Sequence, residues 1–157
     1  MEEEENDLTL SRQEANKVIF TYGVTGAVTY IVYFLIMWAA GLVNHTELRY
    51  VNYILCGMVG FMAMQRVKHQ EGGHVTYLQG LGIAFLTGVV SFILLALFVF
   101  IFAKLNPGFL AAVLKDSPLA FDVYTDPAIV AASLIACEGI AFSVIIALCL
   151  MQYFKSP

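Results

Sequence analysis

The chain has 157 residues, of which 60% are hydrophobic and only 13% are charged, and its mean hydropathy is +0.79. A soluble domain of this size could not bury so much apolar surface, so the composition indicates an integral membrane protein whose main partner is the lipid bilayer. The formal net charge of −4 comes largely from the opening MEEEEND and gives no reason to expect a nucleic-acid partner.

The N-terminal segment is the most acidic part of the chain. We expect residues 1–10 to form an acidic disordered tail, because like charges repel and the segment has little to bury. The sequence Ser11-Arg12-Gln13-Glu14 fits a capping box, in which Ser and Glu each bond the backbone at the other's position. This pattern predicts a helix that starts at Ser11, within a single membrane domain at residues 11–157.

Four long, mainly apolar runs follow, at residues 18–43, 48–67, 78–103 and 127–152. At about 1.5 Å of rise per residue, roughly twenty helical residues cross the core of a bilayer. The run at 48–67 contains Arg49, which we expect to snorkel to the headgroups while longer neighbours pack around the helix. Because backbone groups in lipid must bond within their own helix, the predicted fold is an all-α antiparallel bundle of four transmembrane helices.

The connections between these runs are more polar. Residues 65–77 are expected to form a polar loop. In the longest connection, residues 104–126, Pro107 stands at a typical first helical position and predicts a short interfacial helix near 107–115. Asp126 is expected to cap the fourth helix.

The positions of Lys and Arg predict the orientation, because basic residues are retained on the cytoplasmic side. Five lie on the side of the termini, namely Arg12, Lys17, Arg66, Lys68 and Lys155. Three lie on the other side, namely Arg49, Lys104 and Lys115. This bias places both termini in the cytoplasm, and we expect Arg66 and Lys68 to contact anionic lipid headgroups.

Glu138 is the only ionisable residue well inside an apolar run. A charge at the middle of a membrane helix costs about 2.5–3.5 kcal/mol on insertion scales, so we expect this carboxyl to be neutral or paired. One interpretation is a hydrogen bond to another helix that serves packing. The other is a site that binds and releases a proton, since intramembrane carboxylates often have such roles.

Small residues predict where the helices approach one another closely. Gly23 and Gly26 thin the first run, and Gly80 and Gly88 thin the third. In the fourth run, Gly139 and Ser143 share one face, from which Glu138 is displaced. The carboxyl is therefore expected to meet a different helix from the one packed on the small residues.

The chain resembles a family of small bacterial four-span inner-membrane proteins of unknown activity. The similarity lies between Asn16 and Leu110, in NKVIFTYGVTGAVTY and NYILCGMVGFMAMQRVKHQEGGHVTYLQGLGIAFLTGVVSFI, and again in the closing GIAFSVIIALCLMQYFK. The resemblance implies four spans and a bacterial cytoplasmic membrane. It brings no catalytic or ligand residues, and Glu138 departs from the family pattern.

Two functions from different classes remain open. The first is a structural or accessory subunit that packs against itself or other membrane proteins through its small residues. The second is a proton- or small-solute-handling protein that uses Glu138. An enzyme, a cofactor and a metal site are not expected, because no phosphate-binding glycine loop or nucleophile pattern occurs and the three cysteines lie in apolar runs.

Overall fold

The structure is a computed structural model that describes residues 2–42, 48, 50–70, 76–106, 108–109 and 126–154, with side chains of the first helix from residue 13. It contains the helices α1 (Glu2–Ala39), α2 (Tyr50–Gln70), α3 (Tyr77–Leu105) and α5 (Pro127–Phe154). Within these ranges no residue lies in a strand. The all-α prediction is therefore confirmed for the part of the chain that is described.

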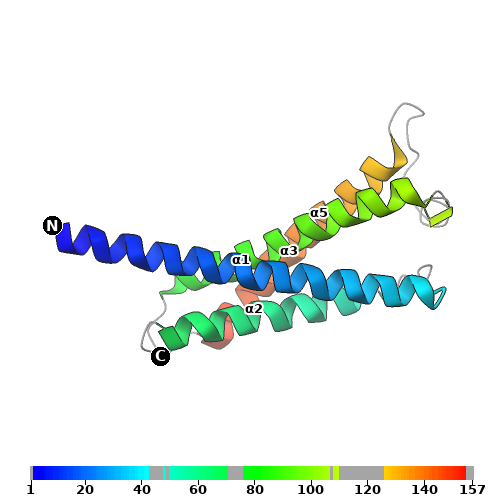
Figure 1. The fold of residues 1–157 in the computed structure, drawn as a ribbon. Helices are drawn as coiled ribbons and strands as arrows, with labels where there is room; N and C mark the ends of the chain where they lie inside the picture. Colours follow the sequence, from blue (N-terminus) through cyan, green and yellow to red (C-terminus); the bar gives the residue numbers. More distant parts are fainter. Residues whose placement is uncertain are drawn as a thin grey trace.

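Consecutive helices run antiparallel, and α1 with α2 crosses α3 with α5 in the shape of an X (Figure 1). The start of α1, the end of α2, the start of α3 and the end of α5 lie at one end, which we call the proximal end. The other end of each of these helices lies at the opposite end of the bundle, which we call the distal end. Both α2 and α3 pack against the three other helices, whereas no described Cα atom of α1 lies within 8 Å of one in α5.

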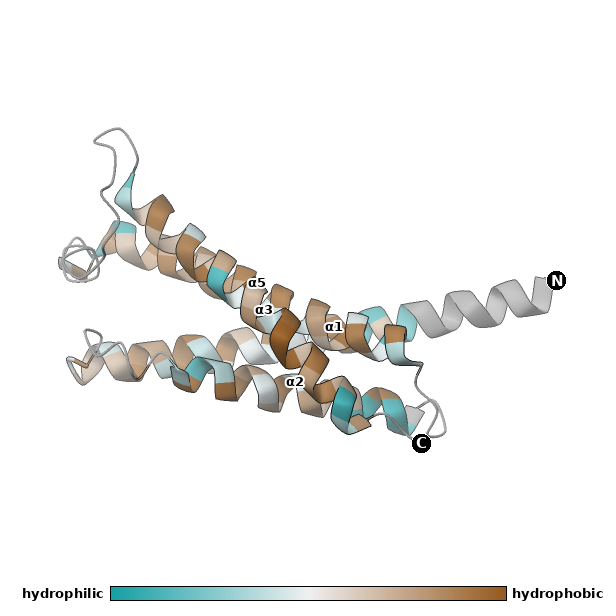
Figure 2. Cartoon of the chain, turned by 180° about the vertical axis from the view of Figure 1, so that it is seen from behind, coloured by the Kyte–Doolittle hydropathy of each residue, from teal (hydrophilic) through white to brown (hydrophobic). Residues whose placement is uncertain are grey.

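Three of the helices are long and apolar enough to cross a membrane, at Gln13–Ala39, Tyr77–Leu105 and Pro127–Phe154. They correspond to the expected spans at 18–43, 78–103 and 127–152. The fourth expected span, 48–67, does not meet this criterion in the described chain, because Asn52, Gln65 and Arg66 lower the hydropathy of α2. Figure 2 shows this difference as hydrophilic segments along α2 beside the largely hydrophobic α3 and α5.

Two helix boundaries differ from the sequence-based expectations. The helix α1 begins at Glu2, so the backbone of residues 2–10 is helical and Ser11 lies inside a helix. Glu has a high helix propensity, and acidic residues suit the N-terminal end of a helix dipole, which the expectation of a disordered tail neglected. The helix α2 extends to Gln70, so the first half of the expected loop at 65–77 is helical as well.

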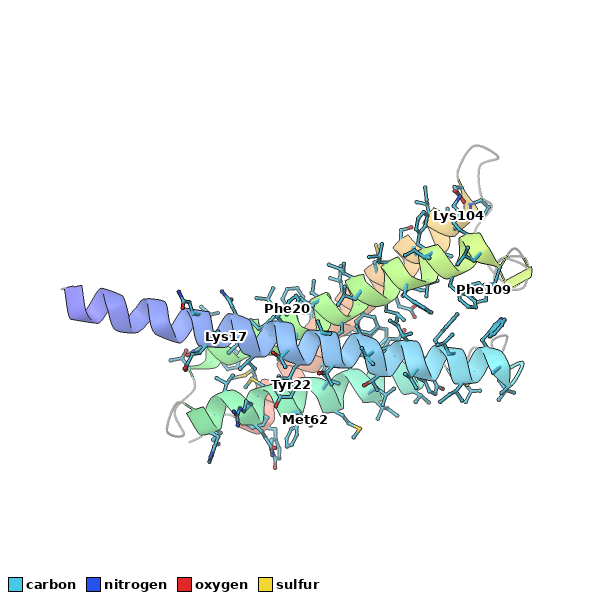
Figure 3. All side chains as sticks on the ribbon, viewed as in Figure 1. Lys17, Phe20, Tyr22, Met62, Lys104 and Phe109 are labelled. Atoms are coloured by element: carbon cyan, nitrogen blue, oxygen red, sulfur yellow. The ribbon has the colours of Figure 1, made fainter. Side chains whose placement is uncertain are left out.

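The expected interfacial helix near 107–115 falls almost entirely outside the described residues. Of that segment, only Gly108 and Phe109 are described, both in helical conformation. Phe109 is 8% exposed and lies beyond the distal end of α3 (Figure 3). Its buried ring ties the start of the connection to the bundle.

An aromatic cluster joins α1 to α3 at the distal end. The ring of Phe34 on α1 meets the rings of Phe98, Phe102 and Phe109 edge-on, with centroids 5.9, 5.3 and 5.4 Å away. Trp38 meets Phe102 edge-on at 5.3 Å. Such edge-to-face pairs contribute about 0.5–1.5 kcal/mol each beyond the area they bury, so the cluster stabilises the distal half of the α1–α3 contact.

Candidate functional site

Glu138 lies in α5, half-buried, and its carboxylate Oε1 accepts a hydrogen bond from the hydroxyl of Tyr53 on α2. The ring of Tyr53 stacks on the ring of Phe142, with centroids 3.7 Å apart and an interplanar angle of 13°. Phe142 follows Glu138 by about one helical turn and therefore shares its face of α5. The ring stack and the hydrogen bond together fix Tyr53 against α5.

The contact joins two different levels of the two helices. Tyr53 stands in the first turn of α2, whereas Glu138 lies well inside α5. The N-terminal end of α2 therefore lies at the same depth as the Glu138 carboxyl. The residues of α5 before Glu138 extend past the N-terminal end of α2 toward the distal end.

A tyrosine hydroxyl can donate to an ionised carboxylate and to the carbonyl oxygen of a protonated carboxyl. The geometry at Glu138 therefore accommodates both protonation states. It supports a hydrogen bond between α2 and α5. Tyr53 was not predicted from the sequence as a partner of Glu138, although a phenol inside an apolar run indicates a polar partner nearby.

The small residues of α5 face α3, as their placement on one side of the helix requires. A Cβ built on Gly139 would lie 2.7 Å from the Cβ of Phe92. A Cβ built on Gly88 would lie 2.8 Å from the Cβ of Ser143, whose hydroxyl donates to the carbonyl of Gly139 at 2.7 Å. Glycine at these positions permits the close approach of α3 and α5.

The remaining glycines named from the sequence also lie at helix contacts. A Cβ on Gly23 would lie 2.7 Å from Val90, and one on Gly26 would lie 3.3 Å from the Cβ of Ser91. The Ser91 hydroxyl donates across the α1–α3 contact to the carbonyl of Gly23 at 2.8 Å. Gly80 lies against flexible methionine side chains of α2 and α5.

The two basic residues expected at lipid headgroups lie near the end of α2. Arg66 is exposed, whereas Lys68 is half-buried with its Nζ 5.7 Å from the ring centroid of Phe154 on α5. A cation over an aromatic face is attracted by about 0.5–1 kcal/mol at exposed sites. Lys68 therefore has a partner within the chain, and headgroup contact by the two residues stays a prediction.

An ion pair that was not predicted from the sequence joins Lys104 of α3 to Asp126 at the distal end. Asp126 Oδ1 also accepts from the backbone N–H of Ala128 at 3.0 Å, which is the expected cap of α5. The hydrogen bond from Lys104 holds the pKa of Asp126 below its usual range. Lys104 and Lys17 lie at opposite ends of the molecule (Figure 3).

No cluster of three or more His, Cys, Asp and Glu suited to a metal ion occurs within the described ranges. No curated protein and no solved structure matches the chain. A family comparison matches residues 21–118, which include α2, α3 and the second half of α1 but not Glu138. The chain therefore belongs to the DUF4199 family, whose members are described as proteins of unknown function.

Proposed function

We propose that this membrane protein is a structural or accessory subunit whose four helices all span the bilayer and pack against a second copy or other membrane proteins. The observation that carries the proposal is the hydrogen bond from Tyr53 to Glu138. It gives the costly intramembrane carboxyl a role in holding α2 to α5. A transported proton or solute is then not needed to explain why the carboxyl is there.

The exposed face of α2 supports its place as the fourth span. Side chains one helical turn apart on this face are large and more than half exposed, namely Tyr50, Ile54, Met58 and Met62. A row of such side chains is uncommon on a surface in contact with water. Lipid or another apolar helix is the environment that suits it.

The bacterial cytoplasmic membrane, with both termini in the cytoplasm, is our proposal for the location. The start of α1 and the end of α5 lie at the same end of the bundle, as an even number of spans requires (Figure 1). The exposed Lys17 and Arg66 belong to that proximal end. Cysteine labelling of intact cells would test the orientation, and a Cys at Arg66 that reacts with an impermeant reagent from outside would reverse it.

Two substitutions test the structural role of the Tyr53–Glu138 contact. Tyr53→Phe keeps the ring stack but removes the donor to the carboxyl, so we expect the free energy of unfolding in detergent to fall by about 1–3 kcal/mol. Glu138→Gln keeps an acceptor oxygen and should change stability by no more than about 1 kcal/mol. Tyr153→Phe is the control, because Tyr153 is 74% exposed. Equal effects of Tyr53→Phe and Tyr153→Phe would contradict the role of the contact.

Native mass spectrometry of the protein extracted with its surrounding lipid tests the accessory role. We expect multiples of the 17.3 kDa chain or a fixed ratio with another membrane protein. A chain recovered only as a monomer would argue against the proposal. The measurement is independent of the Tyr53 variants, because it reports on association and not on folding.

Proton handling at Glu138 is the second candidate function. It is favoured by the position of this half-buried carboxyl within a membrane-length helix, where a phenol is bonded to it, because intramembrane carboxyls often serve proton transfer. An infrared titration of the carboxyl C=O band in the native protein and in Glu138→Gln tests it. A Glu138-dependent band that does not change from about pH 5 to pH 9, the range of raised values for buried Glu, would eliminate this candidate.

A further inference from the structure

An open position interrupts the contact between α2 and α5. Tyr53, Gly57 and Phe61 follow one another at intervals of about one helical turn, so they share a face of α2. The ring of Tyr53 stacks on the ring of Phe142 of α5. The ring centroid of Phe61 lies 5.2 Å from that of Phe154, also on α5. Between these two contacts, a Cβ built on Gly57 would meet no atom within 4 Å.

The space at Gly57 is bordered by apolar side chains. On α5, Ile145 and Cys149 share the face of Phe142, and both are exposed. Deeper in the bundle, a Cβ on Gly60 would lie 3.0 Å from the Cδ1 of Leu150, so α2 and α5 are in contact there. The open position is therefore a shallow apolar groove on the outside of the bundle. We call this groove the α2–α5 seam and define it by Gly57, Phe61, Ile145 and Cys149.

A cation lies at the proximal end of the α2–α5 seam. Lys68 follows Gly57 by eleven residues, which make about three helical turns, so the two residues share a face of α2. The Nζ of Lys68 lies 5.7 Å from the ring centroid of Phe154, and an ammonium group that contacts a ring on one side keeps N–H donors on its other sides. Within the described ranges Lys68 has no carboxylate partner, so its charge is available to an anion.

The spacing between this cation and the open position matches one acyl chain. Eleven helical residues rise about 16 Å, and one leaflet supplies about half of a hydrocarbon core that is roughly 30 Å thick. We propose that the α2–α5 seam binds one anionic phospholipid of the proximal leaflet, with its phosphate at Lys68 and an acyl chain laid across Phe61 to Gly57. The inference rests on the proposed span of α2. It goes beyond general headgroup contact because it assigns one lipid to one place.

A second copy of the chain is less complementary to the seam. Copies in one membrane have the same orientation, and a symmetric contact uses the same patch on both chains. Two α2 helices packed through their seams would therefore bring two Lys68 side chains together at the same depth, and like charges side by side are unfavourable. An anionic headgroup has the opposite charge, and a flexible acyl chain follows a shallow groove.

Native mass spectrometry of the full chain, released from mixed micelles of phosphatidylglycerol and phosphatidylcholine, tests the headgroup. We expect each native chain to retain one phosphatidylglycerol in preference to phosphatidylcholine. Lys68→Gln should reduce this preference by about fivefold, the equivalent of about 1 kcal/mol for one Lys at an anionic surface. Arg66→Gln is the matched control, because Arg66 lies about 200° around the helix from Lys68 and should leave the preference unchanged. Equal losses in the two variants, or no preference in the native chain, would overturn the proposal.

Filling the groove tests the acyl chain separately. Gly57→Leu places a side chain in open space, so it should lower the retention of phosphatidylglycerol without lowering the unfolding temperature. Gly82→Leu is the control, because Gly82 of α3 is equally open and should leave lipid retention unchanged. Unchanged retention in Gly57→Leu would contradict the site. A species of two chains that Gly57→Leu abolishes would show that a second copy occupies the seam, and it would equally refute the lipid.

A separate measurement distinguishes failure of the lipid site from failure of the proposed function. Single cysteines at Tyr50 and Arg66, at the two ends of α2, should react with impermeant reagents from opposite sides of the membrane. If they do and no anionic lipid is retained, the lipid site is wrong while the span stands. Labelling of both from the same side would remove the span and this inference with it. A monomer that retains one phosphatidylglycerol would argue against the accessory role and support the lipid site.

Discussion

Replacing Gly139 with Ala adds one methyl group where α5 approaches α3. The new Cβ would lie 2.7 Å from the Cβ of Phe92 and still closer to two of its ring atoms. Phe92 is 3% exposed and stacks on the fully buried Tyr30, so its ring cannot move aside freely. Overpacking of this kind costs about 1–3 kcal/mol, and the better helix propensity of Ala offsets about 1 kcal/mol. We expect a net loss of up to about 2 kcal/mol.

Reversible unfolding in mixed micelles measures this loss of stability. Ala variants at two other glycines of the bundle serve as comparisons. Around Gly82, a Cβ meets nothing within 4 Å, so Gly82→Ala should show only the propensity gain of up to about 1 kcal/mol. Around Gly80, the added atom meets the Sδ of Met151 at 2.6 Å, and Gly80→Ala should fall between the other two variants because methionine adapts. Equal stability of Gly139→Ala and Gly82→Ala would refute the close α3–α5 contact.

Three further predictions concern the distal cap, the thiols and the N-terminus. Lys104 lowers the pKa of Asp126 in the folded state. The ionised carboxylate therefore contributes to the free energy of unfolding above the ordinary aspartate pKa near 4, and this contribution is lost as the pH falls through the pKa of the folded state. Asp126→Asn should therefore flatten the acid side of a stability–pH profile, and an unchanged profile would contradict the ion pair. Cys137 and Cys149 are exposed, whereas Cys56 is buried. Small membrane-permeant thiol reagents should therefore modify Cys137 and Cys149 much faster than Cys56 in detergent. Equal rates of modification would be incompatible with this packing. Deletion of residues 2–7 should leave insertion and topology unchanged, because acidic residues contribute little to orientation; an inverted product in protease-protection assays would disprove this.

Hydropathy sufficed to predict three membrane-length helices. Long runs without charge have few alternatives in lipid, and glycines in such runs mark places where backbones approach. Gly88 and Gly139, read from the sequence as packing positions, both lie in the α3–α5 contact. The sequence pattern within one run predicts these features because hydropathy and residue size are properties of a single helix.

Properties that depend on the register between helices could not be predicted. Tyr53 as the partner of Glu138 follows from α2 beginning level with the carboxyl, and no periodicity within either helix encodes that offset. The distal ion pair likewise depends on where α3 ends relative to the start of α5. The intermediate hydropathy of α2 had a similar origin, since a helix that contacts all three others can carry residues such as Asn52 that face protein instead of lipid.

The distal aromatic cluster gives the molecule a built-in optical reporter. Trp38 is the only tryptophan of the chain, and it lies in the last turn of α1 with its indole edge-on to Phe102 of α3. Its emission therefore reports on this α1–α3 contact, at the end where the two helix pairs diverge (Figure 1). Any separation of α1 from α3 would change the surroundings of the indole, so motion at this end can be followed by fluorescence in the unlabelled native protein.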